Sequence, residues 1–150
     1  MRLFQAIENS ATGLTAQRLR MDTISDNLAN VNTTRAKRMP DGTYLPYRRK
    51  VTVFENKKQD FAGVLGAEMG NQSGQGVTVS QITEDKEPFK MVYNPGHPDA
   101  NAEGYVLMPN VNVVTEMVDM ISATRAYEAN VTVINSSKSM ALKALEIGRG

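Results

Sequence analysis

Apolar residues recur with a helical period near the start of the 150-residue chain. From about Leu3 to Val31 their spacing alternates between three and four residues, a pattern typical of an amphipathic helix with coiled-coil character. The positions on this stripe are Ile7, Leu14, Met21, Ile24, Leu28 and Val31. Gly13 interrupts the pattern and costs about 1 kcal/mol relative to alanine. We expect the helix to end between residues 30 and 34, where Asn and Thr favour caps and turns.

A second stripe of the same kind runs from about Val111 to Ile147. Its members are Val113, Met117, Met120, Tyr127, Val131, Ile134 and Leu145, with Thr124 and Ala141 at equivalent positions. Lys138 also falls on the stripe and weakens it. Asn110 or Asn112 can cap the start of this helix, and Gly148 stands where it would stop.

The middle of the chain carries the period of short strands instead. Residues 44–55 predict a strand that follows the turn signal Asp41-Gly42. Residues 76–83 and 89–93 predict two more. Residues 63–76 are rich in glycine and predict a connection, and residues 93–104 predict an ordered loop whose prolines and glycines restrict or bend the backbone.

These patterns predict an α+β fold in which two long terminal helices form a coiled-coil-like element beside a small β-rich domain. The expected divisions are residues 1–34, 35–110 and 111–150. The predicted helices are about 43 and 54 Å long, whereas a compact chain of this size has a radius of gyration of only about 15 Å. The pattern leaves two interpretations open: core helices of an ordinary domain, or helices that assemble with other chains.

Composition and candidate chemistry argue against an enzyme. The chain has no cysteine, one histidine and a net charge of +1, so thiol chemistry and cysteine metal sites are excluded. His97 lies between Pro95 and Pro98, where a structural loop histidine is the simpler interpretation. Glu116 and Asp119 are three residues apart and are expected on a solvated helix face. We therefore predict no catalytic residue, cofactor, metal or small-molecule substrate.

A basic segment offers the main competing function. Eight of the 17 cations lie between residues 35 and 58, namely Arg35, Lys37, Arg38, Arg48, Arg49, Lys50, Lys57 and Lys58. Such clustering is found in nucleic-acid-binding modules, but Tyr44 and Tyr47 form no recognised stacking platform. A solvent-facing surface or a contact with an acidic partner is the alternative. Membrane anchoring by the terminal helices is disfavoured, because Lys and Arg dominate neither polar face.

Motifs at both ends of the chain resemble one known family. Ala11-Thr12-Gly13-Leu14-Thr15-Ala16-Gln17-Arg18-Leu19 and Ser25-Asp26-Asn27-Leu28-Ala29-Asn30-Val31-Asn32-Thr33-Thr34 resemble the N-terminal signature of bacterial flagellar rod and hook proteins. Asn110-Val111-Asn112-Val113-Val114-Thr115-Glu116-Met117-Val118-Asp119-Met120-Ile121 resembles their C-terminal signature, and Tyr93-Asn94-Pro95-Gly96-His97-Pro98-Asp99-Ala100 resembles the proximal rod members.

The resemblance implies a structural subunit of the basal-body rod, the shaft that crosses the periplasm, carries torque from motor to hook and encloses the export channel. The implied partners are copies of the same chain, proximal and distal rod subunits, the adaptor between rod and export gate, and the flagellar type III export apparatus. It implies export without a cleaved signal peptide, in keeping with the absence of a signal peptide pattern at the start of the sequence. The terminal stripes above would then be subunit interfaces, and no nucleic acid would be bound.

Overall fold

The computed structural model describes residues 2–40, 42–57 and 76–148, with side-chain environments from residue 4 onward. The described residues form the elements α1 (Arg2–Ala29), β1 (Lys37–Arg38), β2 (Tyr44–Leu45), β3 (Lys50–Asn56), β4 (Val77–Glu84), β5 (Lys90–Tyr93), β6 (Tyr105–Met108) and α3 (Val113–Ile147). Two compact units are distinguished. Unit 1 comprises residues 1–20, 53–81 and 122–150, and unit 2 comprises residues 21–52 and 82–121. Each unit therefore combines a part of α1 with a part of α3.

Both terminal helices are confirmed, and their ends follow from local capping. The backbone N–H of Val114 donates to Oδ1 of Asn112 at 3.1 Å, so Asn112 caps α3. At the C-terminal end of α1, the N–H of Val31 donates to the carbonyl of Leu28 at 3.4 Å, and this hydrogen bond joins residues three apart instead of four. This tightening ends α1 at Ala29, two residues before the predicted stripe ends.

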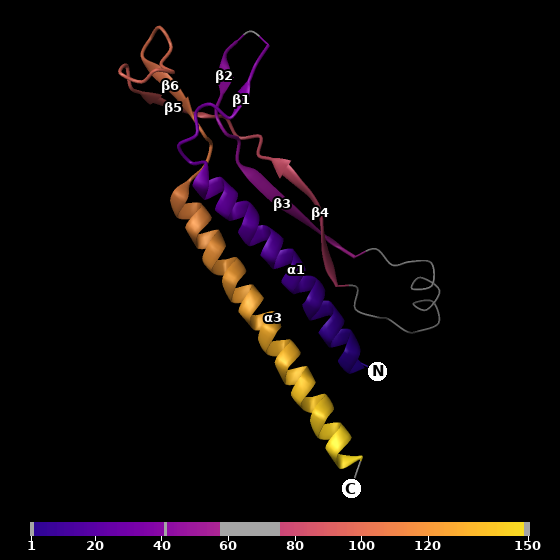
Figure 1. Cartoon of the computed structure of the whole chain (residues 1–150). Helices are drawn as coiled ribbons and strands as arrows, with labels where there is room; N and C mark the ends of the chain where they lie inside the picture. The colour runs from indigo at the N-terminus through magenta and orange to yellow at the C-terminus, as the bar shows by residue number, and fades with distance from the viewer. Residues whose placement is uncertain (1, 41, 58–75, 149–150) are drawn as a thin grey trace. The chain divides into compact units, whose positions relative to one another are not determined.

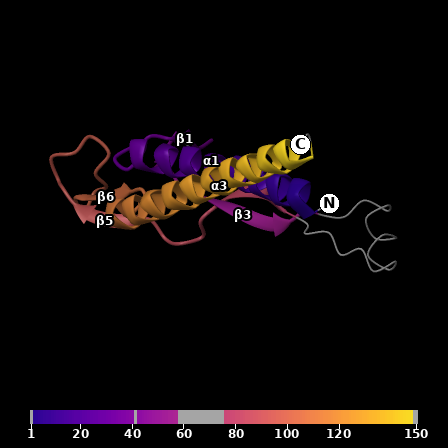
Figure 2. The same cartoon turned by 90° about the horizontal axis from the view of Figure 1, so that it is seen from below.

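In unit 1, the N-terminal part of α1 lies beside the C-terminal part of α3 in the opposite direction (Figures 1 and 2). Gly13 is buried at this contact. A Cβ atom added there would lie 3.1–3.3 Å from the side-chain atoms of Asn130. The glycine that interrupts the apolar stripe is therefore the residue that lets the two helices approach closely.

Replacing Gly13 by leucine is expected to lower the free energy of unfolding by about 1–3 kcal/mol, because the larger side chain overpacks this contact. Urea unfolding followed by far-UV circular dichroism measures the change. Ala11→Leu on the exposed side of the same turn is the control, with an expected change within about 0.5 kcal/mol. Equal stability of the two variants would show that the close approach is not required.

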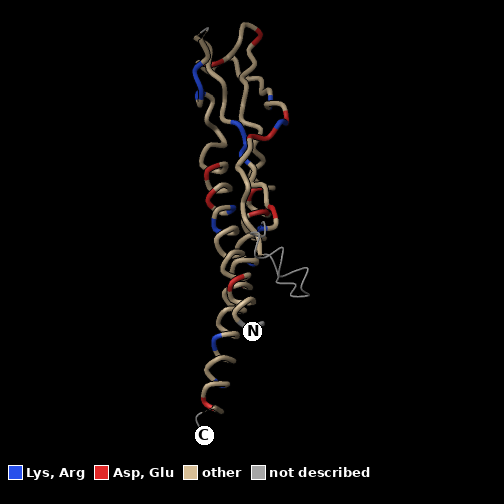
Figure 3. The backbone as a smooth tube through the Cα atoms, turned by 90° about the vertical axis from the view of Figure 1, so that its right-hand side faces the viewer, with Lys and Arg blue, Asp and Glu red and all other residues tan. Residues whose placement is uncertain are grey.

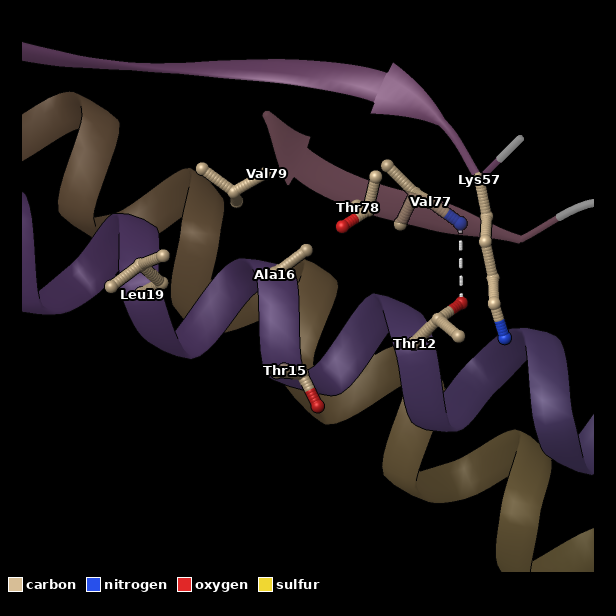
Figure 4. Close-up of a pocket in the computed structure, with 8 residues that line it drawn as sticks. All are labelled: Thr12, Thr15, Ala16, Leu19, Lys57, Val77, Thr78 and Val79. Carbon is tan, nitrogen blue, oxygen red and sulfur yellow. Dashed lines mark hydrogen bonds between the residues drawn. The ribbon is translucent and has the colours of Figure 1, made fainter. Parts of the chain in front are cut away.

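The other side of α1 in unit 1 faces β3 and β4 (Figure 4). Oγ1 of Thr12 accepts a hydrogen bond from the N–H of Val77 at 3.2 Å and donates its own proton to the carbonyl of Asn9 at 2.7 Å. Ala16 is only 3% exposed. Between helix and strand lies an open cleft of about 310 Å³. Helix α1 is thus covered on two sides within unit 1.

The strands pair in three two-stranded sheets, β1 with β2, β3 with β4 and β5 with β6. The strands predicted at residues 76–83 and 89–93 are confirmed as β4 and β5. The single strand predicted over residues 44–55 is wrong, because Pro46 separates β2 from β3. Proline has no N–H to offer a ladder, and the following Tyr47 N–H donates to the carbonyl of Thr33 at 2.9 Å. Strands β1 and β6 are additional, and most of the glycine-rich segment lies outside the described residues.

In unit 2, the β5–β6 hairpin pairs Met91 with Leu107 and Tyr93 with Tyr105. Because residues directly opposite each other share a face, these four side chains lie on one face, and all are exposed. The two tyrosine rings meet edge to face at 5.3 Å. Gly104 allows this contact, since it has a φ of +82° and a Cβ there would lie 2.9 Å from the ring of Tyr93.

Candidate assembly interface

A buried carboxylate lies at the centre of unit 2. Glu116, in the first turn of α3, is 0% exposed. Nε of Arg49 donates to its Oε1 at 2.6 Å. The two terminal nitrogens of the same guanidinium reach Asp85 at 3.2 Å and Asp119 at 3.5 Å. Arg49 therefore joins α3 to the start of β3 and to the turn after β4.

Asn27 connects α1 to the same carboxylate. Its Nδ2 donates to Oε2 of Glu116 at 3.0 Å and to the carbonyl of Lys50 at 2.8 Å. Its Oδ1 accepts from the N–H of Lys50 at 2.8 Å and from the hydroxyl of Tyr47 at 3.0 Å. The Asn27 side chain thus pairs with both backbone groups of Lys50, as a neighbouring strand would, and is only 1% exposed.

A second asparagine completes this group of residues. Oδ1 of Asn110 accepts from the backbone N–H of Arg49 at 2.8 Å, and its Nδ2 donates to the carbonyl of Glu87 at 3.2 Å. We call Glu116, Asn27, Arg49, Tyr47 and Asn110 the Glu116 cluster. It satisfies buried polar groups from both helices and from β3, so these elements hold one another in place.

The electrostatics of the cluster follow from burial and pairing. Burial acts to lower the pKa of Arg49, but its hydrogen bonds to Glu116 and Asp85 together outweigh this and raise the pKa. Burial also raises the pKa of the Tyr47 hydroxyl, with a further contribution from the charges of Asp26 and Glu116. Backbone donation from Glu87 and the Arg49 guanidinium lower the pKa of Asp85. Arginine charged and tyrosine neutral is the favoured state near neutral pH.

The prediction that Glu116 and Asp119 lie on a solvated helix face is wrong for Glu116. It is among the most buried side chains, and Asp119 is paired with Arg49. Sequence reasoning also missed Asn27, Asn110, Arg49 and Tyr47 as a group. The available signal was that Asn27, Asn110 and Glu116 all lie in the two terminal motifs, where polar residues interrupt apolar runs.

The covered face of α3 is largely polar or made of small side chains. Positions seven residues apart, Glu116, Ala123, Asn130 and Ser137, are buried or half-buried. Met120, Tyr127 and Ile134 alternate with them and are half-buried. Only one half of the predicted apolar stripe therefore faces inward. The other half, Val113, Met117, Val131 and Leu145, is exposed.

The predicted positions on α1 are more covered. Ile24 is buried at 6% exposure. The remaining predicted positions are half-buried, and these are Ile7, Leu14, Met21, Leu28 and, after the helix, Val31. Among the described residues, α1 is therefore more covered than α3, which carries most of the exposed large apolar side chains.

In unit 1, α3 has two exposed apolar flanks. At 3.6 residues per turn, Val133, Met140 and Ile147 fall about 90° to one side of the covered face, and Val131 and Leu142 fall about 90° to the other. The surface opposite the covered face carries polar residues, namely Arg125, Glu128, Thr132, Ser136, Ser139, Lys143 and Glu146, all exposed. Single charged residues of both signs occur at intervals along this part of α3 (Figure 3).

In unit 2, the exposed surface of α3 is mostly apolar, with Thr115 as its polar member. Val114, Met117, Val118 and Ile121 are each between 53% and 70% exposed. Large apolar side chains gathered on one exposed face commonly mark a contact with another chain. Exposed aliphatic residues in both units therefore mark surfaces suited to contact with other chains.

Most cations of the basic segment lie close to a carboxylate. Five of its eight cations form ion pairs, and these are Arg35 with Asp99, Arg48 with Glu84, Arg49 with Glu116, Lys50 with Asp26, and Lys57 with Glu8. Lys37 and Arg38 are exposed on β1, and Lys58 lies outside the described residues. No continuous unpaired stripe of the kind that follows a phosphate backbone is formed by the described cations.

His97 lies in the loop between β5 and β6. Nδ1 of His97 accepts a hydrogen bond from the N–H of Asp99 at 3.1 Å, which fixes the ring within its own loop. Across residues 2–40, 42–57 and 76–148, no group of three or more potential metal ligands converges. In the same residues, no helix combines the length and apolar character that a membrane span requires.

Comparisons with known proteins agree with the terminal motifs. Residues 7–37 match the family described as flagella basal body rod protein, and residues 102–147 match the C-terminal region of flagellar basal body rod FlgEFG proteins. The Asn27 and Glu116 positions of the cluster fall within these two matched segments.

Relatives cover the chain from end to end. The flagellar basal-body rod protein FlgC of Bacillus subtilis is 52% identical over 151 residues, which span 99% of this chain and 100% of the relative. FlgC of Borreliella burgdorferi is 52% identical and covers 100% of both chains. FlgC of Escherichia coli O157:H7 is 43% identical over 99% of this chain and 100% of the relative. The chain belongs to the FlgC family of flagellar basal-body rod proteins and is a structural subunit of the rod.

Proposed function

We propose that the chain is a proximal rod subunit whose terminal segments, residues 1–34 and 111–150, assemble into the wall of the shaft. Residues 35–110 form the β-rich part between them. In this role the assembled subunits transmit torque from motor to hook across the periplasm and enclose the export channel. The chain performs no catalysis.

The observation that carries the proposal is the pair of apolar flanks on α3. Helix α3 is covered by α1 on one side and has apolar flanks on two other sides. Each flank can pack against a neighbouring subunit, and repeated contacts of this kind close into a tube. The polar surface of residues 125–146 then faces water. The predicted interface residues Val113, Met117, Val131 and Leu145 are exposed and suited to such contacts.

The half-buried residues Met120, Tyr127 and Ile134 support these contacts from within the chain. Methionine at exposed positions, notably Met117 and Met140, suits surfaces that meet slightly different neighbours, because its unbranched side chain repacks readily. The neighbours we propose are copies of this chain, other proximal and distal rod subunits and the adaptor to the export gate. Delivery occurs through the flagellar type III export apparatus without signal cleavage.

Circular dichroism of the purified chain, alone and mixed with purified rod subunits of the same flagellum, tests assembly through the helices. We expect the mixture to gain helical signal over the sum of its components and to melt at a higher temperature, because isolated helices gain most of their stability from packing. Co-sedimentation at the same concentrations is the matched measurement. An unchanged helical signal with no co-sedimentation would contradict the proposal.

A further inference from the structure

A cleft of about 320 Å³ in unit 2 combines three cations with an apolar floor. The cations are Lys37 from β1, Lys50 from β3 and Arg48 from the segment before β3. The floor is formed by Leu45, Pro46, Tyr47 and Phe89. Its volume lies at the lower end of the range of about 300–1,000 Å³ that is usual for binding pockets.

The guanidinium of Arg48 interacts mainly with uncharged groups, namely two backbone carbonyls and an aromatic ring. Its Nη1 donates to the carbonyls of Asp85 and Glu87 at 2.8 and 3.4 Å, and its guanidinium lies 4.4 Å from the centre of the Phe89 ring. The carboxylate of Glu84 is 3.9 Å away on a side chain that is 73% exposed. Arg49, by contrast, is surrounded by three carboxylates. Arg48 is therefore fixed in position while much of its charge remains available.

The two lysines add to this potential. Nζ of Lys50 lies 5.6 Å from the centre of the Tyr47 ring and 3.6 Å from Asp26, whose side chain is 64% exposed. Lys37 is exposed on β1. Three cations thus face two carboxylates, Glu84 and Asp26. Both carboxylates are on largely exposed side chains, and exposed ion pairs of this kind contribute little.

We propose that this cleft binds an acidic segment of a neighbouring rod subunit, with a carboxylate between Arg48 and Lys37 and an adjacent apolar side chain on the floor. The inference deepens the proposed function and rests on it. Arginine that is stacked and held by carbonyls presents its remaining donors to a carboxylate with little loss of side-chain entropy. The apolar floor favours a polypeptide, which supplies an aliphatic side chain beside its charge.

A nucleic acid fits these features less well. Proteins that follow a phosphate backbone arrange cations along a groove, whereas here three cations line one open cleft. Other cations of the basic segment lie in separate ion pairs, such as Arg35 with Asp99 and Lys57 with Glu8. The cleft therefore gives a role to Lys37, Arg48 and Lys50, whose charged groups lie outside the Glu116 cluster and these two pairs.

Fluorescence anisotropy of the purified full chain tests the proposal with three labelled probes: an acidic peptide Leu-Asp-Glu-Leu, its neutral counterpart Leu-Asn-Gln-Leu, and a short oligothymidylate. We expect binding of the acidic peptide that weakens with salt. Lys37→Gln should weaken it about three-fold and Arg48→Gln about ten-fold. Arg38→Gln is the matched control, because adjacent strand residues point to opposite faces, and it should change affinity less than about two-fold.

Equal binding of the neutral peptide, or an equal loss with Arg38→Gln, would overturn the proposal. Tighter binding of the oligothymidylate with the same dependence on Arg48 would assign the cleft to nucleic acid instead. If Arg48→Gln disturbs folding, exposed Lys37→Gln alone decides the outcome. Failure here is distinguishable from failure of the proposed function, because rod assembly through α3 is measured separately by co-sedimentation with rod subunits.

Discussion

Replacing Glu116 by alanine is expected to lower the free energy of unfolding by about 3–5 kcal/mol. Removal of one member of a buried pair leaves the other charge without compensation. Here Arg49 loses its closest partner at 2.6 Å, and Nδ2 of Asn27 loses an acceptor at 3.0 Å. Because small domains are stable by only about 5–15 kcal/mol, the loss should appear as a large fall in the urea midpoint.

Two comparisons isolate the cause of this effect. Glu128→Ala removes an exposed carboxylate from the same helix, and its stability should change by no more than about 0.5 kcal/mol. The double variant Arg49→Met with Glu116→Leu should be more stable than either Arg49→Met or Glu116→Leu alone, since an apolar pair can replace a buried ion pair at little cost. A urea midpoint for Glu116→Ala equal to that of Glu128→Ala would show that the cluster does not support the fold.

Charges placed on one flank of α3 are expected to abolish assembly while leaving the isolated chain folded. In the variant Val133→Glu with Met140→Glu, both side chains are already 44% and 57% exposed, so monomer stability should change little. In the assembled rod the new carboxylates would be buried without partners, and each such group costs several kcal/mol. The association constant should therefore fall by at least about 100-fold.

Rescue of swimming and of basal-body rods in a strain that lacks this chain measures the effect in the cell, and co-sedimentation with rod subunits measures it in solution. Val131→Glu with Leu142→Glu tests the opposite flank and should fail in the same way. Ser136→Glu with Ser139→Glu adds the same charge to the polar surface of the same helix and should assemble normally. If the polar-surface variant failed as completely as the flank variants, the assignment of faces on α3 would be wrong.

Local signals predicted the helices well. The spacing of apolar residues located both, and Asn112 caps α3 as one of the two predicted candidates. They located β4 and β5 for the same reason, since a period of two is a local property. They failed over residues 44–55, where the ladder breaks at Pro46 and Tyr47 bonds to Thr33 instead.

The face that each helix turns inward was not predictable in the same way. Helical periodicity determines which residues share a face, but a helix with apolar residues around most of its circumference has no unique inward face. The structure selects the face with Glu116, Ala123, Asn130 and Ser137, and leaves Val131, Leu142 and Leu145 exposed. Gly13, which interrupts the apolar pattern in the sequence, lies where the side chain of Asn130 leaves little room for a Cβ atom.

Local patterns in the sequence were enough to predict the two long helices and the α+β class, and the terminal motifs pointed to the rod family. The burial of Glu116 and its contact with Asn27, 89 positions away, emerge only in the folded chain. The physical reason is that helix formation depends on neighbours along the chain, whereas burial of a charge depends on partners brought together by folding. Arg49 and Asn27 make that burial possible, and neither is near Glu116 in sequence.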